Sequence, residues 1–327
     1  MTSLILYTPA GVLAAAAPLR LAARRLKTLG FDVAIDQAAL ARHQRFAGED
    51  DVRLEAIHRV ARARPGVALA TRGGYGLTRL LDRIDWSLLA KSVEAGTRWV
   101  GYSDLTALQM GLLAHAKAPT WWGPLACDDF GRDELDEVTP DCFAEAMSGA
   151  LEAVGFRTEA GFDGLDVRGQ LWGGNLAMLC SLLGTPHWPK VKGGVLMLED
   201  VAEHPYRVER MLLQLHQAGV LGAQKAILLG AFSDWKKSPL DRGYTLKTVV
   251  AHLRSLVDVP ILTGFPFGHV PTKVTVPFGV KGHLAVQGRD AFLGWQEGRA
   301  HHSHDHDGHG HDHGAGLHDH DHDGHAH

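Results

Sequence analysis

Short apolar runs alternate with amphipathic segments along the first third of the chain. The runs have the length and composition of buried strands and lie at residues 4–7, 31–35, 67–70 and 98–102. Between them, apolar residues recur at helical spacing over residues 19–29 and 50–63. Strands that alternate with helices in this way predict a parallel α/β sheet, and in such sheets ligands bind at the carboxyl ends of the strands.

The chain beyond residue 166 carries a different pattern. A strongly apolar strand is predicted at residues 195–198 and ends in Glu199 and Asp200, and the predicted elements shorten toward residue 286. This pattern indicates a mixed α/β domain. We therefore divide the chain into an N-terminal domain, a linker, a C-terminal domain and a tail, at residues 1–135, 136–166, 167–300 and 301–327.

The tail has its own composition. It holds 12 of the chain's 21 histidines together with six aspartates, and it has no lysine or arginine. Such a segment cannot bury a core, which predicts disorder. Imidazole and carboxylate groups bind divalent transition metals, so we expect the histidines between His301 and His327 to be weak metal ligands. We expect no metal in the active site, because a flexible tail cannot hold a fixed coordination site.

Charge and hydropathy exclude two classes of partner. Without the tail, 33 basic residues stand against 31 acidic ones, a balance of +2 that predicts neither nucleic acid nor an anionic membrane as a partner. The apolar run at the N-terminus lacks a basic flank, and no run approaches the roughly 18 apolar residues of a membrane span. We therefore expect a cytoplasmic protein.

Ser103 stands where the strand at 98–102 turns into a helix whose apolar positions include Leu105 and Leu108. Free backbone N–H groups and the positive end of the helix dipole favour a developing negative charge at such a position. This is the setting of a nucleophilic serine beside an oxyanion site. The alternative is that Ser103 caps the helix, for which serine is among the favoured residues.

A nucleophilic serine needs a base and a carboxylate that orients the base. His269 lies in a loop rich in glycine and proline that follows a predicted strand, and a neutral imidazole accepts a serine proton. Glu199 ends an apolar strand, where burial without a partner is costly. The alternatives are an ordinary loop histidine and a carboxylate at the start of the next helix, a role that suits Asp200 better than Glu199.

Two glycine-rich turns complete the set of candidates. The turn from Arg72 to Gly76 can direct backbone N–H groups at an anion, with Arg72 near a substrate carboxylate. The alternative is a tight turn in which Arg72 forms a structural ion pair. The turn that ends at Asn175 is either a contact with substrate or a cap in which Asn175 begins a helix.

Six motifs in sequence together resemble the LD-carboxypeptidases, also called muramoyltetrapeptide carboxypeptidases, of serine peptidase family S66. The motifs span about residues 4 to 290 and therefore both domains. They are Thr8-Pro9-Ala10-Gly11, Arg72-Gly73-Gly74-Tyr75-Gly76, Gly101-Tyr102-Ser103-Asp104, Trp172-Gly173-Gly174-Asn175, Leu198-Glu199-Asp200 with Pro205-Tyr206-Arg207, and Pro266-Phe267-Gly268-His269. The tail lies outside the family pattern.

The resemblance implies a catalytic triad of Ser103, Glu199 and His269. It implies an oxyanion hole, which we assign to the N–H groups of Asp104 and Gly74, with Gly73 as the adjacent candidate. The implied fold is an N-terminal flavodoxin-like parallel sheet, similar to class I glutamine amidotransferases, plus a C-terminal α/β domain. The implied assembly is a homodimer.

The implied reaction releases the terminal D-alanine of a murein tetrapeptide or muropeptide without a cofactor. We assign Arg72, Tyr75 and Asn175 to substrate binding.

Three other functions stay open at this point. A microcin-immunity amidase of the same family cleaves a peptide-nucleotide, for which Trp121 and Trp122 are either an aromatic platform or internal packing. A metal-sequestering protein would act through the tail. A non-catalytic binding module would use Ser103 only as a helix cap.

Overall fold

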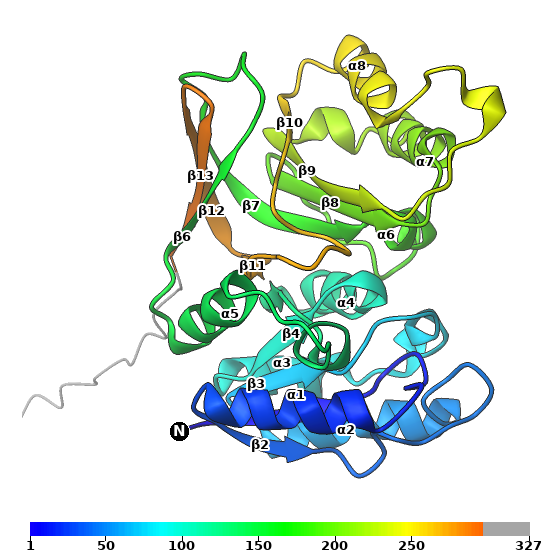
Figure 1. Ribbon diagram of the computed structural model, residues 1–327, viewed down its shortest axis with the longest axis vertical. Helices are drawn as coiled ribbons and strands as arrows, with labels where there is room; N and C mark the ends of the chain where they lie inside the picture. The colour runs from blue at the N-terminus through cyan, green and yellow to red at the C-terminus, as the bar shows by residue number, and fades with distance from the viewer. Residues whose placement is uncertain (297–327) are drawn as a thin grey trace, which may run out of the picture. The chain divides into compact units, whose positions relative to one another are not determined.

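The computed structural model describes residues 1–296, which belong to one compact unit and contain two sheets (Figure 1). The predictions for residues 301–327, disorder and metal binding, lie outside the described residues. Within residues 1–296, none of the helices has the length and apolar character that crossing a bilayer requires.

The first sheet is the predicted parallel sheet. Its six strands run in the order β11-β5-β4-β3-β1-β2, and all neighbours are parallel except β11 and β5. Its strands are β1 (Thr2–Tyr7), β2 (Phe31–Ile35), β3 (Val67–Ala70), β4 (Arg98–Gly101), β5 (Thr120–Trp122) and β11 (Val276–Phe278). The helices in this part of the chain are α1 (Ala17–Thr28), α2 (Asp50–Ala63), α3 (Trp86–Glu94) and α4 (Thr106–Ala116), with short turns η1 (Leu77–Arg79), η2 (Leu81–Arg83), η3 (Ser103–Leu105) and η4 (Ala126–Phe130).

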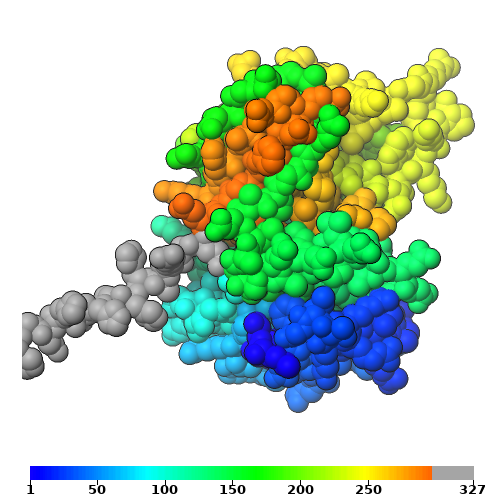
Figure 2. All heavy atoms as spheres, turned by 60° about the vertical axis from the view of Figure 1, so that its left-hand side comes forward, coloured from blue at the N-terminus to red at the C-terminus, as the bar shows by residue number. Residues whose placement is uncertain are grey.

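The second sheet is mixed, as predicted. Its seven strands run in the order β10-β9-β8-β7-β12-β13-β6, parallel from β10 to β7 and antiparallel from β7 to β6. The strands are β6 (Ala153–Arg157), β7 (Asp166–Asn175), β8 (Val195–Val201), β9 (Ala226–Ser233), β10 (Ile261–Thr263), β12 (Lys281–Gln287) and β13 (Asp290–Trp295). The remaining helices are α5 (Val138–Ser148), α6 (Leu176–Leu182), α7 (Pro205–Gln217) and α8 (Leu246–Leu256), with η5 (Leu221–Ala223) and η6 (Pro239–Asp241). Figure 2 shows the surface of β12 and β13, in orange, bordered by the green segment that contains β6 and β7.

Helix α4 lies between the two sheets and carries the start of the site. It packs against β5 of the first sheet and β7 of the second (Figure 1). Its residues from Thr106 to Leu113 are buried on every side, as expected of a helix enclosed by protein. The Ser103 turn η3 leads directly into α4 and contacts β7 of the second sheet.

After β10 of the second sheet, the chain returns to the first sheet. β11 lies in the predicted C-terminal domain but pairs with β5 as the edge strand of the first sheet. The segment predicted as a linker, residues 136–166, contains α5 and β6. The described residues form a single compact unit. The predicted division of the chain into four segments therefore remains a prediction.

Candidate active site

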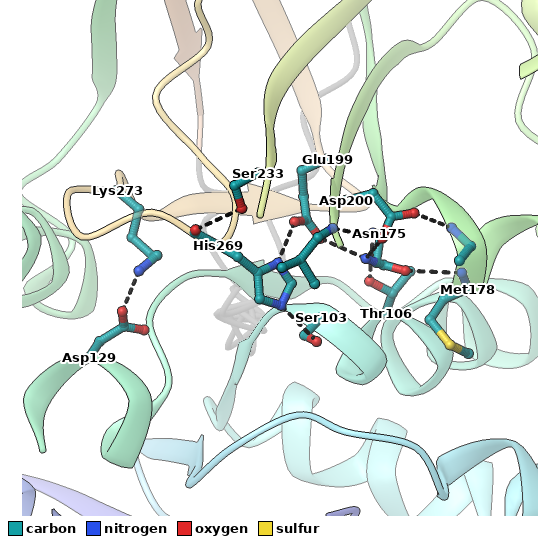
Figure 3. A network of polar contacts seen from close by, with 12 residues as sticks. Ser103, Thr106, Asp129, Asn175, Met178, Glu199, Asp200, Ser233, His269 and Lys273 are labelled. Atoms are coloured by element: carbon teal, nitrogen blue, oxygen red, sulfur yellow. Dashed lines mark hydrogen bonds and ion pairs between the residues drawn. The ribbon is translucent and has the colours of Figure 1, made fainter. Parts of the chain in front are cut away.

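Ser103 occupies a strained turn at the carboxyl end of β4. Its φ is +63°, in the left-handed region that a side chain rarely adopts, and its side chain is buried to 8% exposure. Left-handed backbone at a non-glycine residue costs about 1–2 kcal/mol and concentrates at functional sites. The turn directs the hydroxyl away from the first sheet and toward the loop that carries His269 (Figure 3).

The helix-cap alternative for Ser103 is wrong. The cap of η3 is Tyr102 and that of α4 is Leu105, and neither helix start has a side-chain cap. Backbone geometry explains this, because a capping residue takes an extended conformation and Ser103 is left-handed. Its hydroxyl is instead 3.1 Å from Nε2 of His269.

His269 and Glu199 complete a hydrogen-bonded chain that ends at Ser103 (Figure 3). Nδ1 of His269 lies 2.7 Å from Oε2 of Glu199. A carboxylate can only accept, so Nδ1 carries the proton, and Nε2 is free to accept from the serine hydroxyl. Glu199 is fully buried and the His269 side chain is 21% exposed. The structure thus brings together the three residues predicted from different parts of the chain.

The surroundings of His269 tune its basicity. Burial lowers the pKa of its imidazole, but the hydrogen bond to Glu199 and the charges of Glu199 and Asp200 outweigh burial, and the net pKa is raised. Lys273 acts in the opposite direction. The centres of the Tyr102 ring and the His269 imidazole are 4.8 Å apart, and the two rings meet edge-on. This contact restricts the orientation of the imidazole.

The predicted glycine-rich turn lies directly on the serine. A methyl group built on Gly73 would be 2.7 Å from Oγ of Ser103 and 3.4 Å from the backbone nitrogen of Asp104, so only glycine fits there. The guanidinium of Arg72 donates to the carbonyl of Val12, at 2.9 Å. The predicted alternative of a structural ion pair for Arg72 is not seen among the described residues. Tyr75 is 49% exposed and packs on Phe46.

Two partly buried carboxyl groups face this turn. Burial raises the pKa of Asp104, whereas the backbone N–H of Gly74, the charge of His269 and the Ser103 hydroxyl lower it. Burial also raises the pKa of Asp128, and the charges of Arg72 and His269 oppose that effect. Asp128 was not among the predicted residues. It lies in η4, an element that the sequence pattern does not reveal.

Asn175 lies behind Glu199. It is 6% exposed, its carbonyl oxygen caps α6 through Met178, and its amide donates to Glu199 and to Asp200. The predicted cap is therefore present, and a contact between Asn175 and substrate remains a prediction. Neither carboxylate caps α7, because His204 does so by accepting from Tyr206. The suggested helix-start role of Glu199 and Asp200 is wrong for that helix.

A buried ion pair anchors the loop after His269, and sequence reasoning missed it. Nζ of Lys273 and Oδ1 of Asp129 are in contact, with both side chains almost fully buried. The ammonium also lies 5.1 Å from the centre of the Tyr102 ring. The only sequence signal is a lysine four residues after His269, in a segment of valine, threonine and proline. The pair ties η4 to the loop that delivers His269.

Comparisons with known proteins identify the family of this chain. Residues 5–123 match the LD-carboxypeptidase N-terminal domain and residues 168–284 match the LD-carboxypeptidase C-terminal domain. The chain belongs to the LD-carboxypeptidase family S66. It is accordingly a serine-type carboxypeptidase.

Relatives of this LD-carboxypeptidase match over almost its whole length. The probable murein peptide carboxypeptidase of Bacillus subtilis is 31% identical, with 86% of this chain and 90% of the relative covered. The crystal structure of muramoyltetrapeptide carboxypeptidase from Oxalobacter formigenes superposes with a TM-score of 0.83 at 40% identity, covering 90% of this chain and 99% of that one.

The structure of MccF in complex with glutamyl sulfamoyl guanosine gives a TM-score of 0.78 at 20% identity, with 90% and 96% covered. At that identity the likeness concerns the fold alone.

Proposed function

We propose that this LD-carboxypeptidase hydrolyses the L,D-type amide bond that holds the terminal D-alanine of a murein tetrapeptide. The observation that carries the proposal is the hydrogen-bonded chain from Glu199 through His269 to Ser103. The substrate is suggested by relatives named murein peptide and muramoyltetrapeptide carboxypeptidase.

In the proposed mechanism, Oγ of Ser103 attacks the scissile carbonyl while Nε2 of His269 takes its proton. The carbonyl oxygen becomes an oxyanion that accepts from the N–H groups of Asp104 and Gly74. His269 then gives its proton to the leaving nitrogen of D-alanine, and an acyl-enzyme on Ser103 remains. Water attacks this ester with the same histidine as base, which releases the shortened peptide. Glu199 stays ionised and stabilises the imidazolium throughout.

Substrate recognition in this proposal uses the turn beside the serine. Arg72 has no carboxylate partner among the described ion pairs, and its guanidinium matches the geometry of the substrate's terminal carboxylate. The exposed ring of Tyr75 offers an apolar surface at the rim.

Mass spectrometry of a disaccharide tetrapeptide tests the reaction. Wild type should remove one alanine, and Ser103→Ala should remove none. An unchanged substrate with wild type, or an equal rate for Ser103→Ala, would contradict the proposal.

The peptide-nucleotide amidase is the second candidate, and one finding weighs against it. Trp121 and Trp122 are 6% and 0% exposed, and Trp122 stacks on Phe267 at 3.8 Å. The two tryptophans are therefore part of the internal packing and offer no aromatic platform for a nucleotide base. A peptide-nucleotide substrate incubated in parallel with the tetrapeptide decides between the two activities.

The remaining expectations are also proposals. We propose a cytoplasmic homodimer whose tail, residues 301–327, binds a divalent transition metal weakly without taking part in catalysis. Deletion of the tail should leave peptide cleavage unchanged and abolish nickel or zinc binding in calorimetry. Loss of hydrolysis on tail deletion, with retention in Ser103→Ala, would instead support a function that resides in the tail.

A further inference from the structure

A second buried carboxylate lies immediately behind the Glu199–His269 pair. Asp200 is 3% exposed and shares the amide group of Asn175 with Glu199 (Figure 3). Nδ2 of Asn175 is 3.2 Å from Oε1 of Glu199 and 2.9 Å from Oδ1 of Asp200. Oε2 of Glu199 remains for His269. The reaction proposed above makes no use of Asp200.

Local backbone geometry brings the two carboxylates to one side. Successive side chains of a regular strand point to opposite faces. The pairing of β8 with β9 shifts register between Leu198 and Asp200, an irregularity of the kind that redirects side chains near active sites. Glu199 is also the direct partner of Asn175 in the β7–β8 ladder. The sheet therefore delivers both carboxylates to the same amide.

Both polar atoms of the Asn175 side chain are engaged, which fixes the orientation of its amide. Its carbonyl oxygen accepts from the backbone N–H of Met178, so the nitrogen has to face the carboxylates. Its own backbone N–H donates to the hydroxyl of Thr106, at 3.0 Å. Thr106 is the first residue of α4, the helix that follows Ser103. The network thus connects the serine turn to the strand that carries Glu199.

Asp200 is held as an ionised group despite its burial. Its oxygens accept from the backbone N–H groups of Ala177 and Val201, at 2.9 and 2.8 Å, as well as from Asn175. Asp200 thus accepts from three donors and has no cation within hydrogen-bonding distance. Its negative charge lies where little water is present, and electrostatic interactions there are screened less and act over longer distances. Burial raises the pKa of Asp200 to about 6, which still leaves it ionised at neutral pH.

We propose that Asp200 and Asn175 are positioning residues of the proposed hydrolysis: Asn175 holds Glu199 with one oxygen aimed at His269, and Asp200 fixes that amide and adds a negative charge that stabilises the imidazolium. This inference rests on the function proposed above. The other charged groups facing His269 are Lys273 on its own loop, Asp104 on η3 and Asp128 on η4. None of them contacts Asn175 among the described hydrogen bonds.

The central experiment follows sulfonylation of Ser103 by phenylmethanesulfonyl fluoride across pH, because it needs no assumption about the peptide substrate. Ser103 Oγ forms the S–O bond, fluoride leaves, and His269 takes the proton, so the rate reports the neutral fraction of His269. In Asp200→Asn we expect the rate to fall about 10–100-fold, the size typical for losing a group that orients an active-site ligand. We also expect the acid limb of the profile to move to lower pH, because a negative charge near the imidazole is gone.

The same variant should show a specific effect on turnover. With the tetrapeptide, kcat of Asp200→Asn should fall by a similar factor while KM stays within about twofold, since the carboxylate does not touch substrate. Asp166→Asn is the matched control, because it removes an exposed carboxylate that pairs with His283 at the end of β7 opposite to Asn175. The control should resemble wild type in rate and profile.

Three outcomes separate the two proposals. If Asp200→Asn has the rate and acid limb of the control, the positioning role is wrong. A lower rate with an unmoved limb would mean that Asp200 serves only the structure of β8 and α6, which also overturns it. If wild type neither reacts at Ser103 nor cleaves peptide, the proposed function itself fails.

A second variant covers the case in which Asp200→Asn does not fold. Asn175→Ser keeps a favoured helix cap for α6 but lacks the amide that joins the two carboxylates. We expect it to fold and to lower the rate of sulfonylation about 10–100-fold. A wild-type rate in Asn175→Ser would overturn the proposal.

Discussion

The α carbon of Gly73 lies so close to Ser103 that a methyl group built on it would be 2.7 Å from both Cβ and Oγ of the serine. Real Cβ contacts are essentially never this short, so one of the two residues would have to move. Because the backbone of the serine turn is already left-handed and enclosed, we expect the side-chain hydroxyl of Ser103 to move. That hydroxyl is the group in contact with His269.

Gly73→Ala should therefore lower kcat about 100-fold or more, since a misplacement of about 1 Å at a reacting group costs that much. The backbone itself tolerates alanine there, because φ of Gly73 is outside the left-handed region. Gly222→Ala is the control, with nothing within 4 Å of the added methyl. Rates of tetrapeptide cleavage and melting temperatures of both variants check this. Wild-type turnover in Gly73→Ala would show that the turn does not abut the reacting hydroxyl.

Glu199→Gln should lower kcat about 10⁴-fold, as removal of the orienting carboxylate does in serine proteases. The amide keeps the shape of the side chain but neither fixes the Nδ1–H tautomer nor stabilises the imidazolium. Steady-state kinetics check this against Glu152→Gln, an exposed residue. A loss confined to KM would argue that Glu199 binds substrate instead of orienting His269.

The pH dependence of kcat/KM should report His269. Its raised pKa means that the imidazole stays protonated, and therefore unable to accept the serine proton, to a higher pH than an ordinary histidine of about 6.5. Activity should rise with pH through an inflection above that value. An inflection in wild type well below the pKa of an ordinary histidine would contradict this. It would mean that burial outweighs the effect of Glu199 and Asp200 on the pKa of His269.

Asp200 should make stability depend on pH, and the sign of this dependence should be opposite to that of a salt-bridged carboxylate. Its pKa is about 6 in the folded protein and about 3.8 in an unfolded chain, so the folded state holds the proton more tightly between these values. The free energy of unfolding should then fall as pH rises from about 4 to about 6, by up to about 3 kcal/mol from this group. The difference in melting temperature between wild type and Asp200→Asn, taken as wild type minus variant, should decrease as the pH rises over this range. A flat difference would show that Asp200 titrates normally.

Lys273→Met should destabilise the protein by about 3–5 kcal/mol, because it leaves the charge of Asp129 buried without its cationic partner. Urea midpoints measure this, with Lys281→Met on the exposed side of β12 as control. Adding Asp129→Asn to Lys273→Met should recover part of the loss. If Lys273→Met is as stable as the control, the ion pair does not hold the His269 loop.

Arg72→Gln should raise KM for the tetrapeptide at least tenfold, because a charge-assisted hydrogen bond contributes about 1.5–3 kcal/mol. The measurement that isolates the contact is a substrate with an amidated C-terminus. Wild type should bind it poorly, and Arg72→Gln should hardly distinguish the two substrates. Arg20→Gln, at an exposed position, controls for net charge. Equal discrimination by Arg72→Gln and wild type would exclude this arginine from carboxylate recognition.

Sequence alone determined the elements and the chemical candidates. Strands β2 and β3 begin and end where predicted. For β3 the reason is burial, since residues buried on both faces of a parallel sheet have to be apolar throughout. Ser103, Glu199 and His269 could be selected because each lies near or after the carboxyl end of a strand, and the carboxyl ends of parallel strands form the ligand-binding edge. The short strand β5 and the helix α3 were not anticipated, because three residues or a nine-residue segment carry too little periodicity.

Only the tertiary structure decided how those candidates meet. His269 lies 166 positions from Ser103, and no local pattern fixes a 3.1 Å contact between segments of two different sheets. The left-handed backbone of Ser103 excluded the cap role that its residue type favours. Asp200 and Lys273 gained their roles from burial, since the cost of a charge depends on what surrounds it and not on its neighbours in the chain.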